Sequence, residues 1–222
     1  LAETGPMRQE RGMNAHAFSF CGTTLSALPS GALHWPAAGL LVVGDLHLGK
    51  SLRLARRGGT LLPPYEAEAT LTKLDADLAA TSPERVICLG DSFDDGTAEA
   101  ELDDRTRLWL LRQMAGRDWM WIAGNHDPAP LSLGGSHRAF AQISGLTFRH
   151  IATASASGEI SAHYHPKWRV AGRSRPCFLT DGARLILPAY GAYTGGLFAD
   201  APALASLLAP GALAILTGPR AI

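Results

Sequence analysis

Three short apolar runs, each followed by a glycine and then by polar side chains, constrain the fold of this chain most. The runs cover residues 39–43, 85–89 and 118–122, and they are rich in branched and aromatic residues. Continuous apolar runs of this length are typical of strands that are buried on both faces of a sheet. The sequence therefore predicts three buried strands with polar residues just beyond their carboxyl ends.

Apolar residues recur at helical spacing between these runs, from residue 63 to residue 82 and from residue 98 to residue 114. The alternation of strand and helix predicts a parallel sheet with right-handed crossovers. In such sheets ligands bind beyond the carboxyl ends of the strands. The polar residues after all three strands are therefore expected at one rim of the sheet.

The sequence pattern changes after Ser136, where short apolar segments are separated by Gly, Ser and Pro. This pattern predicts a mostly antiparallel second sheet stacked on the first. We therefore expect an α/β sandwich of two stacked mixed β-sheets flanked by helices. The segments read as strands of the second sheet are residues 146–151, 159–163, 170–171, 177–180 and 184–187.

Composition bounds the class of protein. Of the 222 residues, 46% are hydrophobic and 18% are charged, which excludes a disordered chain. We interpret residues 1–6, which precede Met7, as a vector-derived extension. We expect a flexible N-terminus over residues 1–15 and one domain over residues 16–222. Three widely spaced cysteines, no signal segment and no apolar run near the roughly 20 residues of a membrane span predict a soluble cytoplasmic protein.

Charge is balanced overall but not along the chain. Lys and Arg together number 20, as do Asp and Glu, so no global basic field indicates nucleic acid. Through Pro130 there are 17 acidic and 12 basic residues, whereas the remainder holds 3 acidic and 8 basic residues. An anionic substrate is therefore expected on the C-terminal half.

The polar residues after the strands are of the types that bind metals. If the chain stays extended after residue 43, Asp45 and His47 project to the same side. Asp91 follows the next strand and can bridge two ions with its two oxygens. Further nitrogen and oxygen ligands are offered by Asn125, His126, His150, His163 and His165. Nitrogen and oxygen donors without thiolate indicate Mn, Fe or Zn in a catalytic site, and two ions about 3.5–4 Å apart are usual for attack on phosphorus.

Each of these motifs has a structural interpretation when it is taken alone. Gly-Asp after a strand is typical of a turn or a helix cap, and Gly-Asn-His-Asp also occurs in turns. Isolated histidines such as His16, His34 and His137 are typical of surfaces or of hydrogen-bonded core positions. The ordered combination of the motifs, rather than any one of them, favours a metal centre.

This ordered set resembles the calcineurin-like metallophosphoesterase superfamily, whose pattern is D-x-H, G-D-x-x-D, G-N-H-D/E, H and G-H-x-H. The corresponding segments run from Asp45 to His165. A closer resemblance, over nearly the whole chain, is to the small phosphoesterases encoded beside DNA ligase, helicase and exonuclease genes in bacterial repair clusters. Its segments are GDLHLGK at 44–50, LGDSF at 89–93, HPKWR at 165–169 and AYGAYTGG at 189–196.

The resemblance implies a set of metal ligands, with two divalent ions per chain. One ion would be held by Asp45, His47, Asp91 and His165, and the second by Asp91, Asn125, His150 and His163. His126 would act as a general acid near the leaving oxygen. The chain departs from the pattern at two positions, because Asp95 stands where many members have a phosphate-binding arginine and Ala162 replaces a glycine.

The resemblance also implies a Mn-dependent endonuclease for single-stranded DNA, with Fe, Zn, Ni or Co as other possible metals. The hypothesis is hydroxide attack on phosphorus, with Asp91 and His126 as catalytic residues, in functional association with the ligase, helicase and exonuclease of a repair cluster. Expected substrate contacts beside the metal ligands are Lys50, Arg53, Lys167, Arg169, Arg173 and Thr194. Tyr164 and Trp168 are suited to stacking on unpaired bases.

Two alternatives remain open at the level of sequence. The first is a phosphohydrolase of the same fold that acts on a nucleotide or on a pyrophosphate-linked small molecule. The second is a non-catalytic scaffold that keeps the fold without the metals, which would be marked by missing ligands. None of the seven expected ligands is missing from this chain.

Overall fold

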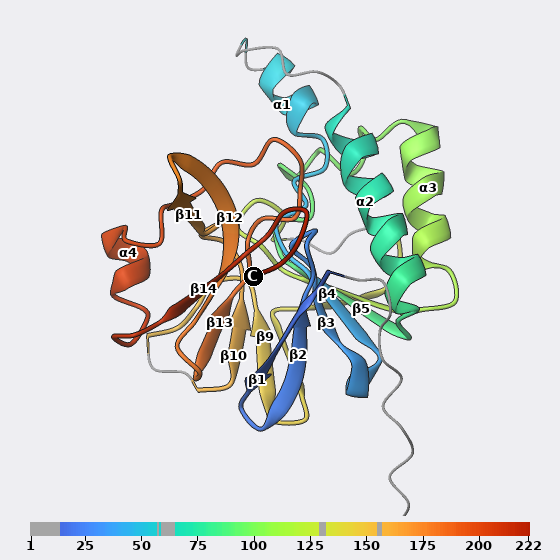
Figure 1. The fold of residues 1–222 in the computed structure, drawn as a ribbon. Helices are drawn as coiled ribbons and strands as arrows, with labels where there is room; N and C mark the ends of the chain where they lie inside the picture. The colour runs from blue at the N-terminus through green and yellow to red at the C-terminus, as the bar shows by residue number, and fades with distance from the viewer. Residues whose placement is uncertain (1–13, 57, 59–64, 129–131, 155–156) are drawn as a thin grey trace, which may run out of the picture.

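The computed structural model describes residues 14–56, 58, 65–128, 132–154 and 157–222. The expected vector-derived extension, and all of the expected flexible N-terminus before residue 14, lie outside the described residues. The described strands form two mixed sheets that pack face to face, with helices on the outer side of each sheet (Figure 1). The predicted α/β sandwich is confirmed.

The first sheet combines an antiparallel and a parallel half. The pairs β1–β2, β2–β3 and β3–β4 are antiparallel, whereas β4–β5, β5–β6 and β6–β7 are parallel. The three strands predicted from the apolar runs are β4, β5 and β6 at the centre of this sheet. In sheet order the strands are β1 (His16–Phe20), β2 (Thr23–Ala27), β3 (Leu33–Trp35), β4 (Leu40–Val43), β5 (Arg85–Leu89), β6 (Asp118–Ile122) and β7 (Ser136–Arg138).

The second sheet is also mixed. Antiparallel pairing joins β8 to β9, and joins β12 to β11, β13 and β14, while β10 runs parallel to both β9 and β13. Its strands are β8 (Phe140–Ile143), β9 (Leu146–Arg149), β10 (Glu159–Ser161), β11 (Lys167–Val170), β12 (Arg173–Thr180), β13 (Arg184–Ile186) and β14 (Leu213–Leu216).

Two long helices cover the outer face of the first sheet. The described helical segments are α1 (Lys50–Arg56), α2 (Glu66–Thr81), α3 (Asp104–Met114), α4 (Pro202–Ala205) and the short 3₁₀ turn η1 (Pro36–Ala38). The helix expected from residue 98 begins only at Asp104, because the Asp103 carboxylate accepts the backbone N–H of Thr106 and caps the helix there. Buried leucines of α2 and α3 pack on β4, β5 and β6, while Leu204 of α4 packs on the second sheet.

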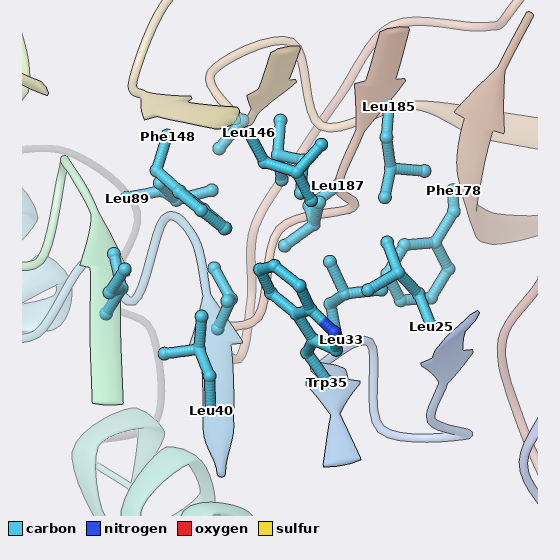
Figure 2. Packing of buried hydrophobic residues seen from close by; sticks show 14 of the residues in the cluster. Leu25, Leu33, Trp35, Leu40, Leu89, Leu146, Phe148, Phe178, Leu185 and Leu187 are labelled. Carbon is cyan, nitrogen blue, oxygen red and sulfur yellow. The ribbon is translucent and has the colours of Figure 1, made fainter. Parts of the chain in front are cut away.

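The main apolar core fills the space between the two sheets. Leu33, Trp35 and Leu40 of the first sheet face Phe148 and Phe178 of the second (Figure 2). Removing a leucine or aromatic side chain of this size from water contributes about 1.5–3 kcal/mol each. This packing fixes the ends of the two sheets relative to each other. Among the described helices, none is long and apolar enough to cross a bilayer.

Candidate metal centre

The polar residues singled out in the sequence lie beyond the carboxyl ends of strands in both sheets. Asp45 and His47 follow β4, Asp91 follows β5, and Asn125 and His126 follow β6. The second sheet contributes three imidazoles, which are His150 after β9 and His163 and His165 after β10. Residues that are far apart in the chain therefore meet where the ends of two stacked sheets converge.

The backbone at these strand ends is not extended. The φ angle is +54° at Asp45, +47° at His47 and +47° at Asp91, and it is +70° at His163 and +48° at His165. Non-glycine residues rarely adopt this left-handed region, and each such residue costs roughly 1–3 kcal/mol that the surrounding structure must offset. The extended backbone that would project Asp45 and His47 to one side is therefore not present. A turn in the backbone brings both side chains to the centre.

Contacts between neighbouring loops hold these strained residues in place. The N–H of Asp45 donates to Gly90 O at 3.2 Å, and the N–H of His47 donates to Asp91 O at 2.9 Å. Gly90 has a φ of +75°, and a Cβ added there would lie 2.6 Å from the His150 ring. Only glycine therefore allows the loop after β5 to lie directly against His150.

Ala162 takes the place of a glycine in the family pattern, and the structure shows how the larger residue fits. A Cβ added at Gly44 would lie 2.6 Å from the Ala162 Cβ. The methyl group of Ala162 thus occupies space that Gly44 leaves open across the two sheets. The close approach that places Asp45 beside His163 is kept, and the N–H of His163 donates to Asp45 Oδ2 at 3.0 Å.

One group of ligand atoms comes from Asp45, His47 and His165. These residues each offer an atom that lies within 4.8 Å of the other two. His165 Nε2 lies 3.3 Å from Asp45 Oδ1. Both of these atoms and His47 Nε2 are buried, and none has a hydrogen-bond partner within the described part of the chain. Buried polar atoms are almost always paired, so three that converge without partners indicate a site for a cation.

A second group is formed by Asp91, His150 and His163, again with ligand atoms within 4.8 Å of one another. His150 Nε2 lies 3.3 Å from Asp91 Oδ2, 3.0 Å from Asn125 Oδ1 and 3.1 Å from His163 Nδ1. The other nitrogen, His150 Nδ1, lies 2.7 Å from Leu89 O. A carbonyl only accepts, so Nδ1 carries the proton and Nε2 is left to face Asp91 and Asn125 as a ligand.

The electrostatics of the second group keep Asp91 ionised. In the metal-free protein burial alone would raise the pKa of Asp91, but the hydrogen bond and charge of protonated His150 and the N–H of His126 outweigh it and lower the pKa to about 2. Burial likewise opposes charge on His150, yet the carboxylates of Asp91 and Asp45 raise its pKa. Asp91 lies in the second group, and its bridging to the first group stays a prediction.

His126 lies outside these two groups, and it forms a third group with His47 and Asp94 whose ligand atoms also lie within 4.8 Å of one another. Its Nδ1 lies 2.7 Å from Asp94 O, so the proton is on Nδ1 and Nε2 is free, 4.0 Å from Asp91 Oδ2. The Asp94 side chain lies 2.8 Å from His47 Nδ1 and also accepts from Arg53 Nε. These contacts fix the His47 ring with Nε2 toward the first group, which is the usual role of a carboxylate behind a metal-binding histidine.

Asp127 is a functional residue that the sequence interpretation did not select. Its carboxylate accepts four backbone N–H groups, from Asp91, Ser92, Phe93 and Gly124, at 2.7–3.1 Å. Burial raises the pKa of Asp127 to about 6, with a further contribution from the charge of Asp91. The side chain therefore ties the loop after β5 to the loop after β6 and sets the position of Asp91.

Replacing Asp127 by alanine is expected to destabilise the fold strongly. Four buried N–H donors would lose their acceptor, and even partial rescue by water leaves a loss on the order of 4 kcal/mol. For a chain of this size that lowers Tm by about 8–16 °C in thermal unfolding. Asp200→Ala, at an exposed position, is the matched control and should leave Tm unchanged. An Asp127→Ala variant that melts within 2 °C of the wild type, about 1 kcal/mol at most, contradicts the clamp.

A buried contact between α2 and the segment after β13 supports the same centre. The N–H of Tyr190 donates to Gly44 O at 2.8 Å, and the N–H of Gly191 donates to Asp45 O at 3.0 Å. Lys73 donates to Tyr190 O, and its Nζ lies 3.9 Å from the centre of the Tyr190 ring. Burial lowers the pKa of Lys73 to about 8. The backbone next to Asp45 is thus anchored to helix α2.

The expected substrate contacts divide into paired and unpaired groups. Arg53 is engaged by Asp94, and the Thr194 hydroxyl donates to Gly191 O at 3.0 Å. Arg56 pairs with Asp95 and Glu101. Asp95, which stands where many family members have a phosphate-binding arginine, thus binds the side chain of Arg56. The remaining expected contacts lie at the start of α1 or in the β11–β12 hairpin, and these are Lys50, Lys167, Arg169 and Arg173.

The residues present fit divalent cations. The first group offers a carboxylate and two imidazoles, and the second offers a carboxylate, an amide oxygen and two imidazoles. No thiolate lies in either group, since Cys88 and Cys177 are buried elsewhere in the described core. Such donor sets suit catalytic Mn, Fe or Zn rather than a structural zinc site.

Comparison with known proteins agrees with this donor chemistry. A model of the calcineurin-like phosphoesterase family matches residues 39–185, a range that includes every expected ligand. The crystal structure of Pseudomonas putida nuclease MPE is similar to this chain, with 28% sequence identity and a TM-score of 0.69. The similarity covers 91% of this chain and 95% of that nuclease. Among curated proteins, no match was found.

The residues matched by the family model include all residues of both ligand groups. The matched range spans more than half of the chain and runs from β4 to β13, the strands whose ends carry the site. Members of this family use divalent metals to hydrolyse phosphoester bonds. This chain belongs to the calcineurin-like phosphoesterase family.

Proposed function

We propose that this protein is a Mn-dependent endonuclease that hydrolyses phosphodiester bonds of single-stranded DNA, with a role in DNA repair. The observation that carries the proposal is the convergence of two groups of ligand atoms, of which three atoms in the first group are buried and have no hydrogen-bond partner among the described residues. The similarity to a nuclease over 91% of the chain favours a nucleic acid substrate over a small phosphate ester.

The chemistry of the centre suits phosphodiester hydrolysis. Bound divalent ions lower the pKa of water, orient the ester and neutralise charge on the phosphoryl oxygens. With both ring nitrogens protonated, His126 would donate the Nε2 proton to the leaving oxygen, while its Nδ1–H stays bound to Asp94 O. Asp94 and Asp127 hold His47 and Asp91 in position.

Exposed aromatic side chains in β11 and in the segment after β13 support a single-stranded substrate. Trp168 is 44% exposed in β11, and Tyr193 is 47% exposed in the segment that follows β13. Tyr193 also has a φ of +57°, in the left-handed region that non-glycine residues rarely adopt. Aromatic faces stack on unpaired bases but have no such access to bases inside a duplex.

The proposal is tested with metal-free protein supplied in turn with Mn, Mg, Zn, Fe and Ni. Circular single-stranded DNA has no ends, so its conversion to linear fragments with Mn would demonstrate an endonuclease. A nucleotide and a pyrophosphate-linked ester are assayed in parallel. Hydrolysis of these two substrates, with the circular DNA left intact by every metal, contradicts the proposal and supports the alternative phosphohydrolase.

The same assay tests His126 through the leaving group. His126→Gln is expected to slow DNA cleavage by about 10²–10⁴-fold, the usual contribution of a general acid. An aryl phosphodiester should be affected far less, because an aryl oxide leaves without protonation. His16→Gln, at an exposed position in β1, is the control. Equal losses on both substrates would show that His126 is not the acid.

A further inference from the structure

A small cavity adjoins the first ligand group. It has a volume of about 240 Å³ and is lined by His165, Lys167, Ser174 and the segment at Thr194. Sites for drug-sized ligands occupy roughly 300–1,000 Å³, so this cavity suits a smaller group. One of its walls is His165, an expected metal ligand, so a group bound in the cavity lies next to the reacting phosphate.

The face of the β11–β12 hairpin that lines this cavity carries two cations. Lys167 lies opposite Pro176 and Arg169 lies opposite Ser174, and residues directly opposite in an antiparallel pair share a face. Lys167 Nζ lies 4.9 Å and Arg169 Cζ 3.8 Å from the centre of the Phe198 ring. The two charges are therefore oriented by one aromatic ring.

The position of that ring is itself fixed by the backbone. The N–H of Lys167 donates to Leu197 O at 2.9 Å, and the N–H of Ala199 donates to Lys167 O at 2.9 Å. A Cβ added at Gly196 would lie 2.0 Å from His165 O, so only glycine lets this segment lie against the ligand. The ring, both cations and His165 are thus held by one short stretch of paired backbone.

Neither cation is neutralised within the described part of the chain. No carboxylate of the described residues lies within 4.0 Å of Lys167 or Arg169, whereas Arg53 and Arg56 are both engaged by carboxylates. Two unpaired cations beside a cavity that also borders a metal ligand favour an anionic occupant. The Ser174 hydroxyl adds a neutral donor on the same wall.

We propose that this cavity is a subsite for the backbone phosphate that adjoins the scissile phosphate of a polynucleotide. The inference rests on the proposed function and adds a specificity determinant to it. Lys167 and Arg169 contact the adjoining phosphate through charge-assisted hydrogen bonds, while the scissile phosphate lies at the metal centre. The enzyme therefore prefers chains with at least two consecutive phosphates over isolated phosphodiesters.

Not all of the substrate contacts that were expected from the sequence belong to this subsite. Arg173 lies opposite Val170 on the other face of the hairpin, so it is outside the subsite. The Thr194 hydroxyl is occupied by Gly191 O, which makes Thr194 a wall of the cavity rather than a phosphate donor. Arg53 positions Asp94 instead of binding substrate. Of the expected substrate contacts, only Lys167 and Arg169 belong to the subsite.

The test uses single-stranded oligonucleotides with one assigned cleavage position, assayed with Mn. In two further oligonucleotides, a neutral methylphosphonate replaces the phosphate on the 5′ or the 3′ side of that position. For the wild type, one of the two replacements should lower kcat/KM roughly tenfold or more, since a hydrogen bond to a charged group is lost. For the double variant Lys167→Gln, Arg169→Gln, the same replacement should change kcat/KM less than threefold.

Control variants separate the subsite from general effects. Arg85→Gln removes an exposed arginine at the opposite end of β5 and should keep the wild-type sensitivity to methylphosphonate. Lys167→Arg keeps the charge and should restore most of the sensitivity that Lys167→Gln loses. The subsite is refuted if neither replacement affects the wild type, or if the double variant remains as sensitive as the wild type. Absence of any cleavage of unmodified DNA or aryl ester by the wild type would instead refute the proposed function.

Discussion

Replacing Asp91 by asparagine is expected to lower kcat on an aryl phosphodiester by about 10³-fold or more. Mutating a residue that only hydrogen-bonds to a metal ligand already lowers activity by about 10–100-fold, and loss of a ligand itself has a larger effect. The substitution keeps the shape of the side chain, and the amide oxygen can still accept the N–H of His126 that Asp91 Oδ1 accepts. It removes the charge that faces His150 at 3.3 Å and that a divalent cation needs. Thermal unfolding of the metal-free variant should therefore stay close to that of the metal-free wild type.

Asp95→Asn is the matched control for Asp91→Asn. Asp95 lies four residues further on, outside both ligand groups, where it pairs with Arg56 and accepts the N–H of Thr97. Its substitution should change kcat by less than twofold. If Asp91→Asn keeps a tenth or more of the wild-type rate while its fold is intact, Asp91 is not a ligand essential for the reaction.

The part of the fold that carries the site could be predicted because its signals are local. The apolar runs that form β4, β5 and β6 are buried on both faces, and parallel pairing places the residues after them at one rim. The strands β1 to β3 and helix α1 were not predicted. They are short, and β1 has exposed residues over most of its length, so no clear apolar pattern marks them.

Residue types at the site could also be predicted, but their backbone could not. Asp45 and His47 would share a side if the chain stayed extended, whereas both reach the centre from left-handed conformations. Such conformations are imposed by contacts with other loops, such as the bond from Asp45 N to Gly90 O. Those contacts join segments that are tens of residues apart, and no single stretch of sequence encodes them.

The supporting residues were missed for the same reason. Asp127 accepts N–H groups from two loops, and Asp94 orients His47 from a separate loop. An acidic residue next to a metal motif is equally suited to a turn, a cap or a ligand, so its type alone does not show which it is. A run of backbone N–H groups opposite one carboxylate is visible only once the loops are placed together.

Removal of metal is expected to abolish activity and to lower stability, because ligand atoms of the first group would be left buried without partners. Asp45 Oδ1, His47 Nε2 and His165 Nε2 have no hydrogen-bond partner among the described residues. A ligand that binds only the folded state at 100 times its dissociation constant raises stability by about 2.7 kcal/mol. Restoring Mn to the stripped protein should therefore raise Tm by several degrees and recover the rate.

The central claim is that these scattered side chains hold two cations, and anomalous diffraction from crystals soaked with manganese tests it most directly. We expect two anomalous peaks per chain. One should lie between Asp45, His47 and His165, and the other between Asp91, His150 and His163. No peak at either position, or manganese bound only at other surfaces, would contradict the claim.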